Sequence, residues 1–375
     1  MMKTSNTRRR ASMLWLRMHA FASITVLAMG TAASAQGTSG APAVAVSGPR
    51  AVGVNILHLN VTDLDKSLAF YRDALGMEPT APLAPARPGG GLVSEPGAML
   101  RTVILRVPGG SFSFELVEWT GVPLRPHKPR IQDPGQIMLA MNVRDLDAKL
   151  TAAKKLGLHV LTKGGEPFVT EGRNGARNRA VMIQDPTGFV VELVDNPGAP
   201  NTGTDSGTGA ITSVAVYVTV QDLAQTVAFY NKAFGFTMPE PPAVNATSER
   251  VKALFDNPSL ATMRTARGTF PGSDFSINFQ EFAGVDRKPA RHRVQDPGGP
   301  IFLVQVQEFP AVIELVRAHG GIIGPGESSV ALAPDARSSW VRDPNGVLLQ
   351  LSVPRPPRAG GPAAVSPAPA PAPRP

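Results

Sequence analysis

The sequence predicts an α+β fold made of four consecutive β-α-β-β-β units. Three observations carry this prediction. A block of about 145 residues occurs twice, and each block is built from two similar halves that combine strand-like runs with one helix. In both halves of the first block, the helix begins at an aspartate. With 375 residues, of which 42% are hydrophobic, the chain is long enough to form more than one core.

The two ends have compositions that differ from the rest. Residues 1–35 read as a signal peptide, with a basic Arg8-Arg9-Arg10 stretch, an apolar run too short to span a bilayer, and the small residues Ala33-Ser34-Ala35 as a cleavage site. We expect export to the periplasm or the extracellular space; a Sec-type signal is favoured over a twin-arginine one. Residues 36–52 form a flexible lead-in, and residues 354–375 form a Pro/Ala-rich disordered tail.

The net charge of +8 does not belong to the predicted fold. Five of these charges fall in the leader and three in the tail, so residues 36–353 are electrically balanced. A balanced body gives no electrostatic reason to expect nucleic acid as a partner, and the mature chain offers no stretch for stable membrane insertion. The absence of cysteine excludes disulfides, thiolate metal sites and a cysteine nucleophile.

The duplicated blocks are module 1, residues 53–196, and module 2, residues 211–353, joined by a linker over residues 197–210. Four motifs recur at offsets of 158 to 163 residues. They are the start of each module (Ile56 to Met77 and Val214 to Phe236), Phe112 to Trp119 with Phe275 to Phe282, Gln132 to Gly135 with Gln295 to Gly298, and Asp185 to Gly188 with Asp343 to Gly346.

Within module 1, each half begins with an apolar strand that ends in a helix start. The segments Val61 to Asp65 and Val143 to Asp147 carry the aspartate that caps the helix, and Gly76 and Gly157 suit the positive φ of a helix end. Strands are then expected over Thr102 to Val107, Ser111 to Trp119, Ala180 to Gln184 and Phe189 to Val194. The Asp-Pro-x-Gly elements are expected to be hairpin turns.

These residues resemble the vicinal oxygen chelate (VOC) superfamily of glyoxalases, bleomycin-resistance proteins and extradiol dioxygenases, over both modules. The resemblance rests on the strand histidine His58, the Asp-Leu-Asp helix starts, the Phe-Tyr and Leu-Gly pairs, and the turn that precedes Glu192. It implies two half-open β-barrel modules that hold a divalent metal. Carried over, the ligand positions in module 1 are His58, Glu115, Met138 and Glu192.

The resemblance therefore implies a candidate metal site of His58, Glu115 and Glu192, which departs from the family at Met138. One imidazole and two carboxylates suit Mn, Fe or Mg, with Zn or Ni as further candidates. Such an ion would stabilise an enediolate while Glu115 or Glu192 moves the proton, which is isomerase, epimerase or lyase chemistry. Ring cleavage by a dioxygenase is less expected without a second histidine. In module 2, Tyr217, Asn278, Ile301 and Gln350 occupy the ligand positions and are poor ligands.

How the units pair is left open by the sequence. In some family members the units pair within a module, and in others the first pairs with the fourth and the second with the third. In the swapped arrangement, His58 and Glu115 would face Ile301 and Gln350. Met138 and Glu192 would then face Tyr217 and Asn278. Either way the units can pair inside one chain, so a monomer is an acceptable assembly.

The remaining polar and aromatic candidates concern a small-molecule ligand. Trp119 lies on a site strand, and Arg177 and Arg179 precede a hairpin turn, where they could hold a carboxylate or phosphate. The run Gly89-Gly90-Gly91 lacks the strand-to-helix context of a phosphate loop, so we expect a flexible loop and no nucleotide cofactor. The alternative to an enzyme is a metal-free binding protein that sequesters its ligand, or a structural remnant without a ligand.

Overall fold

The computed structural model describes residues 48, 50–93, 95–108, 110, 112–171, 176–196, 210–272, 276–326, 329–332 and 335–354. The predicted leader, nearly all of the lead-in and the linker, and the tail beyond residue 354 lie outside the described residues.

Four β-α-β-β-β units follow one another along the described chain, as predicted. Unit 1 contains β1 (Arg50–Val61), α1 (Leu64–Leu68) with its continuation η1 (Ala69–Ala74), β2 (Glu78–Pro79), β3 (Arg87–Pro88), α2 (Gly90–Val93), β4 (Met99–Arg106) and β5 (Ser113–Thr120). Unit 2 contains β6 (Ile137–Val143), α3 (Leu146–Lys155), η2 (Lys163–Gly165), β7 (Phe168–Glu171), β8 (Arg177–Gln184) and β9 (Val190–Asp195).

Units 3 and 4 make up the second half of the chain. Unit 3 contains β10 (Ile211–Thr219), α4 (Leu223–Phe234), β11 (Asn245–Ala246), α5 (Glu249–Leu254), β12 (Thr262–Thr269) and β13 (Ser276–Ala283). Unit 4 contains β14 (Pro300–Gln307), α6 (Phe309–Ala318), β15 (Ile322–Ile323), β16 (Ser338–Arg342) and β17 (Leu348–Ser352).

Local sequence signals explain where the helices begin and end. The side chains of Asp63, Asp145 and Asp222 each accept a hydrogen bond from the backbone N–H three residues further on, at 2.9 to 3.1 Å, and so cap α1, α3 and α4. Gly76 and Gly157 have φ angles of +86° and +72°, which only glycine adopts without strain. The predicted caps are confirmed.

The units pair between the modules rather than within them. Strand β1 of unit 1 runs antiparallel to β14 of unit 4, and β6 of unit 2 runs antiparallel to β10 of unit 3. Sheet A therefore has the order β15-β16-β17-β14-β1-β5-β4-β2, with β3 also paired to β4, and sheet B has the order β11-β12-β13-β10-β6-β9-β8-β7. Of the two pairings left open by the sequence, the swapped one is found.

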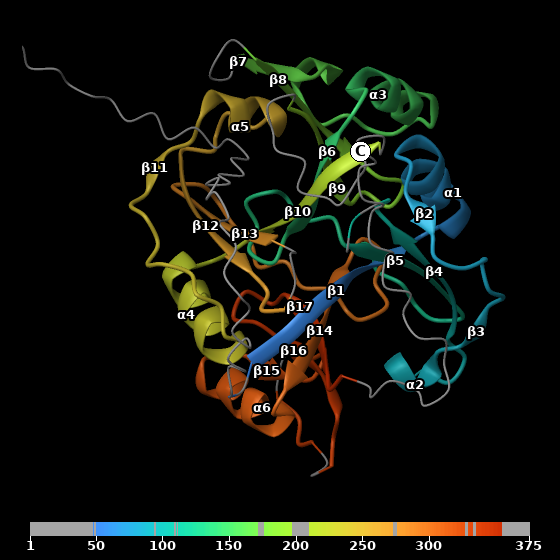
Figure 1. The fold of residues 1–375 in the computed structure, drawn as a ribbon, viewed down its shortest axis with the longest axis vertical. Coiled ribbons are helices and arrows are strands. Elements are labelled where there is room, and N and C mark those ends of the chain that lie inside the picture. The colour runs from blue at the N-terminus through green and yellow to red at the C-terminus, as the bar shows by residue number, and fades with distance from the viewer. Residues whose placement is uncertain are drawn as a thin grey trace, which may run out of the picture.

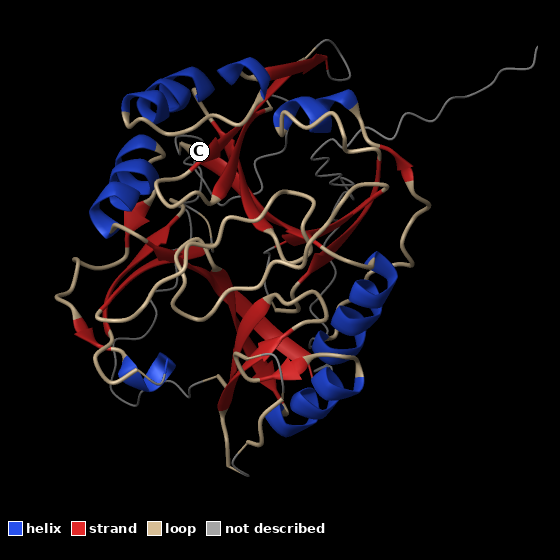
Figure 2. Cartoon of the chain, turned by 180° about the vertical axis from the view of Figure 1, so that it is seen from behind, coloured by secondary structure: helices blue, strands red, loops and turns tan. Residues whose placement is uncertain are grey.

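The helices lie around the outside of the two sheets, and loops cross the centre of the molecule (Figures 1 and 2). The main core packs the helices against one face of each sheet, with Leu57, Phe114, Leu193 and Phe279 fully buried in it. The opposite faces carry separate, smaller clusters and hold the candidate sites. Among the described residues, no helix has the length and apolarity needed to cross a membrane.

The glycine run at residues 89–91 differs from the prediction of a flexible loop. Residues Gly90–Val93 form the one-turn helix α2, and Val93 packs on the side of sheet A opposite the main core. A side chain at position 89 would collide with Leu100 and Trp119, which explains the glycine there. The glycines therefore allow a close approach of α2 to the sheet.

Candidate functional site

The pair His58 and Glu115 is the centre of the first candidate site. The two residues lie opposite each other on the parallel strands β1 and β5, and His58 Nδ1 is 3.2 Å from Glu115 Oε2. Their neighbours Leu57 and Phe114 are fully buried in the main core, so strand alternation places the pair on the other face of sheet A. The two side chains are 12% and 17% exposed, so the pair is partly open to solvent.

Asn60 fixes the hydrogen bonding of the His58 ring. Its amide nitrogen donates to the carbonyls of Val294 and Gly299, so its oxygen Oδ1 faces His58 Nε2 at 3.0 Å. The indole Nε1 of Trp119 donates to the same oxygen at 2.8 Å. Both ring nitrogens of His58 therefore face acceptors, and only the doubly protonated imidazolium donates to both. When the ring carries both protons, this geometry is that of an imidazolium–carboxylate ion pair.

Sequence reasoning missed Asn60. The signal was available, because residues two apart in a strand share a face, and His58 and Asn60 have this spacing. Trp119 was expected to contact a substrate. In the structure its ring is 3% exposed and its indole nitrogen orients Asn60.

Apolar side chains from units 1 and 4 surround the ion pair. These side chains form two groups, and Val93 of α2 packs against both. The groups are Ala98, Leu100, Val117 and Trp119 from unit 1, and Val294, Ile301, Leu303, Trp340 and Leu348 from unit 4. Gln350 lies opposite Leu303 on β14 and opposite Trp340 on β16. On β17 it is the polar residue between Leu349 and Leu351, which are both buried in the core. A low-dielectric surrounding of this kind strengthens the field of a charged pair.

The three predicted metal ligands do not come together. His58 and Glu115 meet in sheet A, whereas Glu192 lies on β9 of sheet B. Within the part of the chain that the structure describes, no three or more His, Cys, Asp or Glu side chains are placed to hold an ion. Both nitrogens of His58 already have protein partners. These residues therefore do not fit a divalent metal, because the swapped pairing puts Ile301 and Gln350 where the other ligands were expected.

Glu192 belongs to a second cluster, on sheet B. Its Oε1 accepts from Arg250 Nη2 of α5 at 2.9 Å, and the two side chains are only 5% and 16% exposed. Met138 and Tyr217 are paired residues on β6 and β10 beside it, and Asn278 pairs with Tyr217 on β13. The four family positions of units 2 and 3 are thus assembled in one place, but as a methionine, an amide, a phenol and one carboxylate that is already paired.

The Glu192 cluster is closed by α5. The remaining cavity measures about 30 Å³, which is room for one or two water molecules and not for a substrate. Burial raises the pKa of Glu192, and the Arg250 guanidinium opposes that shift. Burial and the nearby Glu192 carboxylate raise the pKa of Tyr217 well above its usual value. Glu192 therefore pairs with Arg250 in a cavity that is too small for a substrate.

Arg177 and Arg179 lie away from both clusters of site residues. Arg179 forms ion pairs of 2.8 Å with Asp147 and with Asp195, while Arg177 is exposed at the start of β8. The cross-strand pair Arg179–Asp195 has counterparts in two other units, namely Arg101–Glu118 and Arg264–Glu281. A contact repeated in three units binds a strand pair together. Arg179 therefore has a structural role in sheet B, and its contact with a substrate stays a prediction.

The comparisons with known proteins concern the family and the fold. Residues 53–193 match the model of the Glyoxalase/Bleomycin resistance protein/Dioxygenase superfamily. A curated relative, the 2-epi-5-epi-valiolone epimerase of Actinomyces sp, is 32% identical over 161 residues, which cover 84% of that protein and 40% of this chain. Less than half of this four-unit chain thus covers most of the length of the relative.

Two solved structures are similar to this chain over a larger part of its length. A mutant of glyoxalase I from Zea mays has a TM-score of 0.50 at 16% identity, covering 81% of this chain and 94% of that chain. Another structure of glyoxalase I from Zea mays has a TM-score of 0.49 at 17% identity, covering 82% and 92%. At this identity the likeness concerns the fold alone. By the family match and the epimerase relative, the chain belongs to the Glyoxalase/Bleomycin resistance protein/Dioxygenase superfamily.

Proposed function

We propose that this protein is a small-molecule isomerase of the epimerase type in which the His58–Glu115 pair moves a proton without a metal ion. The observation that carries the proposal is the pair itself: a histidine nitrogen and a carboxylate oxygen 3.2 Å apart, partly exposed, on a sheet face that also carries two apolar clusters. The family and the epimerase relative support this class of chemistry. The proposal keeps Glu115 as the catalytic carboxylate and leaves Glu192 out of the reaction.

Glu115 is the base in this scheme. Its Oε2 faces His58, and the other oxygen, Oε1, has no hydrogen-bond partner among the described side chains. Oε1 takes the proton from a carbon next to a ketone, and the electron pair of the broken C–H bond moves onto the carbonyl oxygen to give an enolate. The positive charge of His58 stabilises this negative charge. Return of a proton from solvent to the opposite face of the carbon gives the epimer, and nothing is oxidised or reduced.

A second candidate function is metal-free binding without turnover. Its specific support is that Asn60, Trp119 and Glu115 satisfy both nitrogens of His58 inside the protein, as a purely structural ion pair would be satisfied. In this case the partly buried Trp340 would contact a ligand that leaves unchanged.

Exchange of a carbon-bound proton with solvent separates the two functions. The full chain is incubated in D₂O and EDTA with 2-epi-5-epi-valiolone, the ketone in the name of the relative, and with related hydroxyketones. Deuterium incorporation next to the ketone is followed by proton NMR. We expect exchange by the wild type and a loss of about 100-fold or more in Glu115→Gln, because loss of a general base typically costs 10²–10⁴ in rate.

The matched control is Glu192→Gln, the equivalent position in sheet B. It removes the same group from the closed cluster and should leave the exchange rate within a few-fold of the wild type. Exchange that stops when EDTA is added, or that Glu115→Gln does not slow, would contradict the proposal. Saturable ligand binding by calorimetry, with no exchange for any compound that binds, would establish the binding function instead.

A further inference from the structure

Two loops of the same design cross near the centre of the molecule. They are residues 121–134, which lead into β6, and residues 284–297, which lead into β14. In both, an arginine pairs with the aspartate three residues later, Arg130 with Asp133 and Arg293 with Asp296. Matching backbone hydrogen bonds of 2.7 Å tie each loop to the other: His127 N to Pro297 O, and Ala290 N to Pro134 O.

The side chains do not follow this symmetry. The two modules can be aligned by placing Asp133 on Asp296 and Asp185 on Asp343. In this alignment, one of the two crossing points has three basic or imidazole side chains that the other crossing point lacks. The pairs are His127 against Ala290, His292 against Pro129, and Arg342 against Gln184. Because the other crossing folds with the same backbone hydrogen bonds and none of these side chains, the backbone does not require them.

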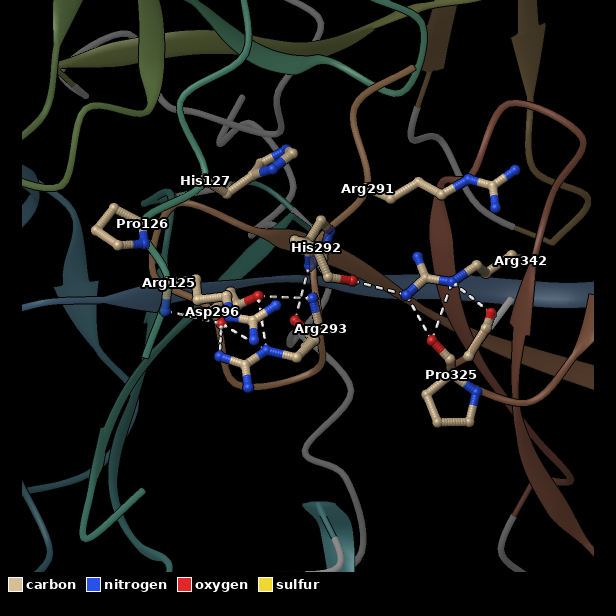
Figure 3. Close-up of a pocket in the computed structure, with 10 residues that line it drawn as sticks. Arg125, Pro126, His127, Arg291, His292, Arg293, Asp296, Pro325 and Arg342 are labelled. Carbon is tan, nitrogen blue, oxygen red and sulfur yellow. Dashed lines mark hydrogen bonds and ion pairs between the residues drawn. The ribbon is translucent and has the colours of Figure 1, made fainter. Parts of the chain in front are cut away.

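A cavity of about 290 Å³ lies at the basic crossing (Figure 3). It is lined by Arg125, Arg291, Arg293, Arg342, Asp296, His127, His292, Pro126, Pro325 and Gly326. Four arginines and one aspartate give the lining three net positive charges with neutral histidines. Two of the arginines are fixed: Arg293 by Asp296, and Arg342 by the carbonyls of His292, Pro325, Gly326 and Gly346.

Three other side chains of the cavity, those of Arg125, Arg291 and His127, are not held in this way by the described residues. Arg125 and Arg291 are exposed, and no side chain that the structure describes forms an ion pair with either guanidinium. The ring of His127 lies 4.8 Å from that of His292, and its Nε2 is buried without a hydrogen-bond partner in the described structure. Burial lowers the pKa of His127 to about 4 and that of His292 to about 3, so both rings are neutral at pH 7.

We infer that this cavity binds a small dianion that bears phosphate or carboxylate oxygens. The planar guanidinium groups of Arg125 and Arg291 match such oxygens in shape and charge, and the half-buried ring of His127 lines the same cavity. A cavity of this size holds a small ion or a short-chain acid and excludes a nucleic acid strand. The site is separate from the His58–Glu115 pair and does not depend on the proposed function.

The test uses the full chain and isothermal titration calorimetry with inorganic phosphate and, separately, malonate, each against sodium chloride of equal ionic strength. The two probes distinguish a phosphate site from a dicarboxylate site. The variants are Arg291→Ala and Arg125→Ala. Their matched controls are Lys128→Ala and Lys288→Ala, which remove a positive charge from the same loop positions at the other crossing.

We expect saturable binding of at least one probe, weakened about tenfold or more by each arginine variant, which is the usual effect of removing one charged hydrogen-bond donor. The two lysine variants should bind within about twofold of the wild type. No saturable binding of either probe would overturn the inference. So would equal weakening by the lysine and arginine variants, because that result reflects general charge rather than a site.

Discussion

The buried ion pair between Arg250 and Glu192 gives the sharpest prediction about why the cluster on sheet B is closed. We consider Arg250→Met, which keeps most of the apolar stem of the side chain and removes its charge. The Glu192 side chain is 5% exposed, so the variant leaves a carboxylate buried without its partner. Breaking a buried pair in this way costs about 3–5 kcal/mol of the free energy of unfolding.

This cost has a defined pH dependence. The pKa of Glu192 is already raised above 4.5 by burial, and Arg250 acts against that shift, so its loss raises the pKa further. A carboxyl with a raised pKa in the folded state binds a proton more readily there than in the unfolded state. The variant therefore loses stability as pH rises from about 4.5 through the raised pKa.

The assay is urea unfolding of the wild type and of Arg250→Met between pH 4 and 8. The difference between the two proteins should be largest above pH 7 and should shrink toward pH 4. The double variant Glu192→Gln with Arg250→Met should recover most of the loss at pH 7. Lys252→Met is the matched control on the same helix, because its pair with the exposed Glu249 should contribute less than about 0.5 kcal/mol. A loss in Arg250→Met no larger than in Lys252→Met, or one independent of pH, would refute the reasoning.

Three further predictions concern the scaffold. Tyr71→Phe should cost about 1–2 kcal/mol in urea unfolding, because the Tyr71 hydroxyl donates to the buried carboxyl of Asp185 at 2.9 Å. Burial raises the pKa of Asp185 and of Asp343 from 3.8 to about 6. The free energy of unfolding should therefore fall as pH rises from about 4 to 6, by up to about 3 kcal/mol for each group. Asp185→Asn should reduce this dependence on pH. Arg179→Ala should cost about 1 kcal/mol in the same assay, and the exposed Arg177→Ala should stay within about 0.5 kcal/mol of the wild type.

The unit architecture was predictable because its signals are local. An aspartate that caps a helix and a glycine with positive φ depend on a few adjacent residues, and each occurs in more than one unit. The pairing of units was not predictable, because β1 offers an apolar edge to either β6 or β14. The choice between them depends on packing between segments about 80 or 250 residues apart, which periodicity does not report.

The candidate site was predictable only in part. The resemblance to the family implied that His58 and Glu115 share a site in unit 1, and the two lie opposite each other on β1 and β5. Glu192 failed as a partner because its position depends on the pairing between units. Arg179 could have been recognised as structural from the sequence, because Arg101 and Arg264 precede acidic residues by a similar interval in other units. Nothing in the sequence aligned His127 with His292.

The pairing of units, more than the identity of single residues, determines what each side of this molecule can do. Pairing within module 1 would have placed His58 and Glu115 across from Met138 and Glu192, with two carboxylates around one imidazole. The swapped pairing gives His58 the apolar partner Ile301 instead. Among the described residues, each surviving acid then has one side-chain nitrogen partner, which is His58 for Glu115 and Arg250 for Glu192. Only the first of these pairs remains partly open, so chemistry at the family's site positions can persist in sheet A alone.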